Sequence, residues 1–253
     1  MSDRVHARFP ESLPVRIAKI TLKALGLILV FGTIVFFLWR AFISTIVPSE
    51  IAGLSPNTTL SEVYTDAQAA GKSLTLYTPT MPKEALNTMV VDKNYGYFTA
   101  ADTVFIEEAD QVQVLLRYNN STIKHLMKDY GLTERPDRTG NLYDVTLYVV
   151  YDKTPEDDTD NGKMGDTNVT TERIRATSVS SAESIMYNYR RLTFDGVDMN
   201  NPAKPVLAVY VDIYYIGDVD YDKDAYGTLC IYDYKAQREP YELSKKEIVS
   251  LIQ

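Results

Sequence analysis

Residues 205–217 read PVLAVYVDIYYIG, and apolar side chains occupy every second position of this stretch. Such alternation is typical of a β-strand that buries one of its two faces. The same period recurs in LYDVTLYVVYD at 142–152 and in QVQVLLRYN at 111–119. We therefore expect three long strands, each of which turns an apolar face toward a common core.

Weaker alternation, bounded by turn residues, predicts further strands at 73–78, 97–107, 172–179, 184–194 and 226–234. About eight short strands at this spacing favour two antiparallel sheets packed face to face, an immunoglobulin-like β-sandwich over residues 59–253. No parallel βαβ pattern is present, which argues against a Rossmann or TIM-barrel architecture.

Short helices are predicted to flank the strands. Thr59 and Glu62 have the spacing of a capping box before a helical stripe at 60–70, and Gly71 follows as a stop. A second short helix is expected at 121–130, before Gly131, and a third after the capping box formed by Ser244 and Glu247 at the end of the chain. The predicted class is thus mainly β with short flanking helices.

The longest apolar run lies near the N-terminus. Residues 24–39 read ALGLILVFGTIVFFLW, and the run resumes after Arg40 to reach Val47. As a helix, residues 24–47 would be about 36 Å long at 1.5 Å per residue, enough for a bilayer core of about 30 Å. A cleaved signal peptide has a similar basic flank, but this run is too long and no small-x-small cleavage site follows it. We expect an uncleaved transmembrane signal anchor.

Charge predicts the orientation of this helix. The net charge is +3 over residues 1–50 and −11 over residues 51–253, which gives −8 for the whole chain. By the positive-inside rule, residues 1–23 form a short basic cytoplasmic tail. After a linker at 48–58, the domain at 59–253 is expected outside the cell membrane. The acidic domain also argues against nucleic acid as a partner.

Cysteine and histidine are scarce, which narrows the function classes. Cys230 is the one cysteine, and His6 and His125 are the two histidines, so disulfide frameworks and Cys- or His-rich metal centres are excluded. An outside domain that does not rely on disulfides favours a bacterial envelope. Cys230 and His125 are the one conceivable thiol–imidazole pair, but Cys230 lies within a predicted strand. Because no catalytic motif is present, we expect that the protein is not an enzyme.

An acidic run is the candidate metal site. Asp218, Asp220, Asp222 and Asp224 alternate along one predicted loop, and such carboxylates can converge on Ca²⁺. The glycine and the terminal glutamate of a calcium-binding loop are missing from this run. A solvated hairpin tip is therefore the preferred interpretation, and a calcium site is the alternative. A second acidic run, at 156–162, departs from the same pattern. We expect no cofactor, and a calcium ion at Asp218–Asp224 is the alternative.

Tyrosines suggest a binding platform. Tyr187, Tyr189, Tyr214 and Tyr232 fall on predicted strands, and neighbouring strands would bring their rings together as a surface for glycan or protein. The alternative is that these rings are cross-strand packing pairs.

These observations predict a single-pass envelope protein whose outer domain binds a protein or a wall polymer, with the lipid bilayer as its other partner. The general design resembles that of many bacterial envelope proteins. A calcium-stabilised adhesion or structural domain and an envelope hydrolase are the alternatives.

Overall fold

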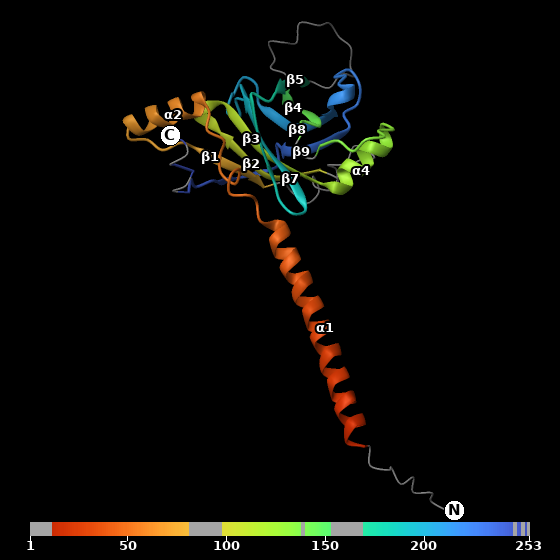
Figure 1. Ribbon diagram of the computed structural model, residues 1–253. Coiled ribbons are helices and arrows are strands. Elements are labelled where there is room, and N and C mark those ends of the chain that lie inside the picture. Colours follow the sequence, from red (N-terminus) through yellow and green to blue (C-terminus); the bar gives the residue numbers. More distant parts are fainter. Residues whose placement is uncertain are drawn as a thin grey trace, which may run out of the picture. The chain divides into compact units, whose positions relative to one another are not determined.

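The computed structural model describes residues 12–80, 98–137, 140–152, 169–244, 247–248 and 251 (Figure 1). The chain divides into two compact units, Met1–Ile46 and Val47–Gln253.

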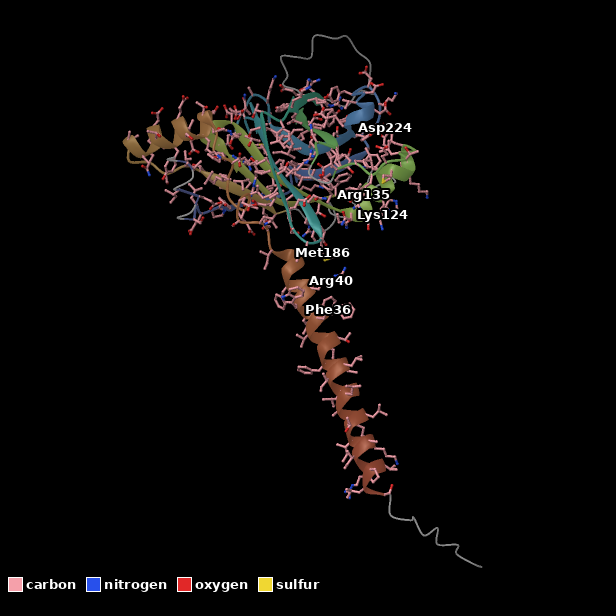
Figure 2. The ribbon with its side chains drawn as sticks, in the orientation of Figure 1. Phe36, Arg40, Lys124, Arg135, Met186 and Asp224 are labelled. Atoms are coloured by element: carbon pink, nitrogen blue, oxygen red, sulfur yellow. The ribbon has the colours of Figure 1, made fainter. Side chains whose placement is uncertain are left out.

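The described part of the first unit contains one long helix, α1 (Leu13–Thr45). Its segment Leu13–Phe42 is long and apolar enough to cross a membrane, a test that a signal sequence also passes. Side chains such as Phe36 and Arg40 project outward from the helix (Figure 2). The hydroxyl of Thr33 donates to the carbonyl of Leu29 at 2.7 Å. Because this polar group is satisfied within the helix, it adds little to the cost of placing the helix in lipid.

The second unit contains two antiparallel sheets, as predicted. The larger sheet has six strands in the order β10 (Gln237–Pro240), β1 (Leu76–Thr80), β2 (Phe98–Ile106), β3 (Gln111–Asn119), β7 (Tyr187–Asp195) and β6 (Ser178–Glu183). The smaller sheet has four strands in the order β5 (Val169–Arg175), β4 (Tyr143–Asp152), β8 (Val206–Tyr215) and β9 (Gly227–Asp233).

The principal core lies between the two sheets. Alternate residues of β3, β4 and β8 enter one hydrophobic cluster, among them Val114, Leu147 and Val211, none of which is exposed. The three stretches with the strongest alternation are therefore strands with one face in this core, which confirms the expectation. Leu126 of helix α4 (Asn120–Asp129) is also buried in the cluster.

The six-stranded sheet is covered on its other face as well. Leu54 and helix α2 (Thr58–Ala69) pack on β1 and β2, where Leu60 joins Val104 and Ile106 in a second cluster. β3 is likewise buried on both faces along residues 111–116, because Ile51 packs on Leu115 and Ser55 bonds to Gln113. This additional layer was not expected from the sequence.

Residues 48–58, expected as a polar linker, are also packed onto this face in part. Ile51 and Leu54 are each 4 % exposed. The backbone amide of Ser55 donates to Oε1 of Gln113 at 2.7 Å, and Nε2 of Gln113 donates back to the carbonyl of Ser55 at 2.9 Å. These bonds join the start of the domain to the middle of the larger sheet.

The glycine stops and one of the two capping boxes predicted at the helix ends are present in the structure. Gly71 and Gly131 follow α2 and α4 with φ values of 66° and 62°, the left-handed conformation expected of a helix stop. The N-cap of α2 is Asn57 rather than Thr59, because the Asn57 side chain accepts from the amide of Leu60. The predicted box at the C-terminus is present, since the amide of Ser244 donates to Oε2 of Glu247 at 2.8 Å.

Candidate binding site

The four tyrosines of the expected platform do not come together. Tyr187 and Tyr189 lie on β7, with ring centroids 6.3 Å apart. Tyr214 lies on β8 in the other sheet, and its ring packs at 5.1 Å from that of Tyr221. Tyr232 is part of the principal core, 5.7 Å from Phe105. The structure therefore does not bring the four rings together on one surface, because β7 pairs with β3 and β6 whereas β8 and β9 belong to the smaller sheet.

The packing alternative describes most of these rings. Tyr189, Tyr214 and Tyr232 are buried, while Tyr187 is half-buried. The guanidinium of Arg117 lies 4.6 Å from the centre of the Tyr187 ring, a cation–π contact within the same sheet.

The acidic run at 218–224 forms a loop that Tyr221 attaches to the smaller sheet. The Tyr221 hydroxyl donates to Asp144 on β4, and Nη1 of Arg173 on β5 donates to the Tyr221 carbonyl at 2.7 Å. Asp220 forms an ion pair with Lys223 at 3.1 Å and accepts from the amide of Asp222. The hydrogen bond from Lys223 lowers the pKa of the Asp220 carboxyl.

In the part of the chain that the structure describes, no three His, Cys, Asp or Glu side chains are grouped so as to hold a metal ion. The four aspartates are largely directed to solvent, and Asp224 is exposed (Figure 2). The second acidic run, at 156–162, lies outside the described residues.

Cys230 is a buried residue of β9, only 7 % exposed. Burial raises the pKa of its thiol to about 11, and Sγ lies 3.4 Å from the carbonyl of Tyr232. A thiol in this environment carries little thiolate at neutral pH and is a poor nucleophile.

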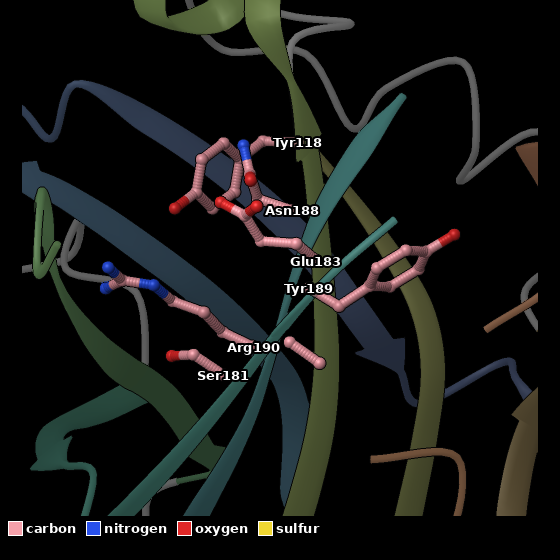
Figure 3. A pocket seen from close by; sticks show the side chains of 7 residues that line it. Tyr118, Ser181, Glu183, Asn188, Tyr189 and Arg190 are labelled. Carbon is pink, nitrogen blue, oxygen red and sulfur yellow. The ribbon is translucent and has the colours of Figure 1, made fainter. Parts of the chain in front are cut away.

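A cavity of about 200 Å³ is lined by residues of the neighbouring strands β3, β7 and β6 (Figure 3). Tyr118 comes from β3, Ser181 and Glu183 from β6, and Asn188 and Arg190 from β7. Tyr118, Asn188 and Glu183 follow one another across the three strands in register. The exposed side chain of Glu183 stands at the open side of this row.

The side-chain amide of Asn188 has no hydrogen-bond partner among the residues that the structure describes. The residue is 2 % exposed, and both Nδ2 and Oδ1 are buried without such a partner. Such groups are destabilising when buried, so an amide left in this way points to a ligand that completes it.

The guanidinium of Arg190, by contrast, forms hydrogen bonds within the protein. It points away from Asn188 in Figure 3 and donates to Oδ1 of Asn141 at 2.7 Å and to the carbonyls of Tyr143 and Gly140. It holds the segment before β4 and is not available as an anion-binding group.

Sequence reasoning did not select this site, although the sequence holds a signal for it. Asn188 and Arg190 occupy the same face of β7 as Leu192 and Phe194, which are buried in the principal core. Two polar residues at core-facing positions of a strand indicate either the boundary of the hydrophobic core or a ligand-binding site.

A second cavity, of about 580 Å³, lies between residues 49–56 and the segment from Tyr241 to Glu247. Its wall carries the carboxyl groups of Glu50, Glu242 and Glu247. Glu247 is already engaged, because it accepts from the Tyr241 hydroxyl and from the Ser244 amide.

The chain matches no family model, no curated protein and no solved structure. The inference of function therefore rests on the geometry of the chain itself.

Proposed function

We propose that the protein is a single-pass membrane protein of a bacterial envelope and that its β domain is an interaction module. In this proposal α1 spans the cell membrane, the basic N-terminus is cytoplasmic, and the immunoglobulin-like domain binds a protein or a wall polymer outside. The length and apolar composition of α1 and the basic residues that precede its most apolar part support the anchor and the orientation.

One observation favours binding over a purely structural role. The cavity at Asn188 combines a buried amide that lacks hydrogen-bond partners with the exposed edge of the sheet at β6. A domain that serves as a spacer alone has no need for such an amide. The chemistry of catalysis has no comparable support, since the Cys230 thiol has a raised pKa.

Labelling of introduced cysteines tests the anchor and its orientation. Because Cys230 is buried, the native protein should not react with a membrane-impermeant maleimide. Labelling by this reagent then reports on the introduced cysteine in each of the two variants, Ser2→Cys and Ser49→Cys. We expect labelling of Ser49→Cys in intact cells and of Ser2→Cys only after permeabilisation. Labelling of Ser2→Cys in intact cells would contradict the orientation, and a mature chain that lacks α1 by intact mass would identify a signal sequence instead.

A further inference from the structure

The four edge strands of the two sheets are protected to different degrees. β10 is short and contains Arg238, Glu239 and Pro240, and β5 carries charged residues along its length. β9 packs against β1 and β2 of the other sheet. Charges, proline, short length and coverage are the usual means by which a sheet edge is kept from pairing with another chain.

β6 lacks charges and proline over most of its length. Its sequence is SVSSAE, with no proline and one charge at the last residue, Glu183. Among the described residues, no strand pairs with its outer side. Val179 in the strand is 51 % exposed, and Ile185 in the turn that follows is 70 % exposed. Apolar side chains at an open edge are typical of a contact surface.

The register shows which backbone groups of β6 point outward. The amide of Ser184 donates to the carbonyl of Tyr187 at 2.8 Å and closes the β6–β7 hairpin. Hydrogen-bonded pairs alternate from there, so Ala182 and Ser180 bond to β7. The N–H and C=O groups of Val179 and Ser181 consequently face away from the sheet.

The cavity at Asn188 lies directly behind this edge, with Ser181 and Glu183 of β6 as part of its wall. Its volume of about 200 Å³ suits one side chain rather than a polymer. A second amide is the ligand group that matches Asn188 fully, because it accepts from Nδ2 and donates to Oδ1 at the same time. The exposed side chain of Glu183, opposite Asn188 in the register, is the group that must move to admit it.

We propose that β6 accepts an extended segment of a partner polypeptide, which continues the six-stranded sheet and inserts a glutamine side chain into the cavity to pair with Asn188. This proposal rests on the proposed function and specifies its partner. The partner is a different protein rather than a second copy, because residues 51–253 carry a net charge of −11 and would repel one another. The same charge favours a segment without acidic residues.

The test uses the full chain in nanodiscs and a displayed library of random peptides. Ser181→Pro removes an outward N–H and leaves the bonds to β7 intact. Thr171→Ala, at an exposed position of β5 on the edge of the other sheet, is the control. We expect selected peptides to bind the wild type and Thr171→Ala equally and to lose about tenfold or more in affinity on Ser181→Pro. Asn188→Leu should abolish the preference for glutamine at one peptide position.

Val179→Lys is a second edge variant that does not depend on the tolerance of β6 for proline, because its side chain is half exposed. It should weaken binding in the same direction, with unchanged thermal melts as the check on folding. If the selected peptides bind both edge variants as tightly as the wild type, the proposal for β6 is overturned. The proposed function as an interaction module would not be affected by that result.

Two other outcomes also overturn it. Selective binding of wall-polymer fragments, with no peptide selected, would replace the peptide by a glycan and retain the proposed function. A wild-type dimer that becomes a monomer in Val179→Lys would assign the edge to a second copy. If neither peptides nor wall-polymer fragments bind the protein, the result would count against the proposed function as well.

Discussion

Arg191 is expected to hold the start of the β domain against the larger sheet. Its side chain is 1 % exposed, and Nη1 lies 2.9 Å from Oδ2 of Asp102. Nη2 donates to the carbonyls of Ile51 and Ala52 at 3.3 and 3.1 Å. The substitution Arg191→Met keeps much of the apolar stem and removes all three bonds.

The expected cost follows from the burial of this pair. Removal of one partner of a buried ion pair typically costs about 3–5 kcal/mol. The Asp102 side chain retains 28 % exposure, so water can compensate part of the loss. We therefore expect the lower end, about 3 kcal/mol. For a domain of this size that corresponds to a fall in Tm of about 6–12 °C.

Thermal melts of the full-length protein in detergent, followed by circular dichroism, measure this change. Arg175→Met is the matched control, because Arg175 is an exposed arginine of β5, and its Tm should stay close to that of the wild type. Hydrogen exchange at the Ser55 amide gives a local measure, since this amide bonds to Gln113 within the same layer. A Tm for Arg191→Met that matches the control, or unchanged exchange at Ser55, would refute the reasoning.

Three further predictions concern calcium, the thiol and alkaline pH. Because Asp220 is paired with Lys223, we expect coincident melts in millimolar calcium and in EDTA, and a higher Tm in calcium would restore the calcium-stabilised alternative. Cys230, whose thiol pKa is raised to about 11, should react with a thiol reagent at pH 8 only after denaturation; fast reaction in the native state would show that it is accessible. Burial and the neighbouring Glu172 raise the pKa of Tyr151 to about 12, above the value near 10 in the unfolded chain. The unfolded state therefore loses this proton first, and the stability present below pH 10 should decline toward pH 12, with the tyrosinate absorbance of the native protein lagging behind that of the unfolded one.

Much of the strand content could be predicted because burial of one sheet face imposes a period of two. β3, β4 and β8 follow the predicted stretches closely. The predicted strand at 172–179 instead joins the end of β5 to the start of β6, since the chain passes from one sheet to the other after Arg175. The alternation of apolar and polar side chains gives no sign of such a change of sheet.

The sites were harder to predict because they depend on which strands are neighbours. The tyrosine platform required β7 to lie beside β8 and β9, and the pairing of β7 with β3 and β6 removes that possibility. Pairing also explains the Asn188 cavity: β6 is the edge, so the core ends there and a polar residue is left behind it. Likewise, the burial of Arg191 depends on residues 51–52, which are distant in sequence.

Recognition of a partner through β6 can be measured by crosslinked capture of partners from native membranes, read by mass spectrometry. Three baits are compared: the full chain, a control that retains residues 1–47 alone, and the full chain with Val179→Lys. We expect a partner that crosslinks to the full chain, is missing from the span-only control and is strongly reduced by Val179→Lys. The same set of proteins on the full chain and on the span-only control would contradict the claim that the β domain recognises a partner through β6.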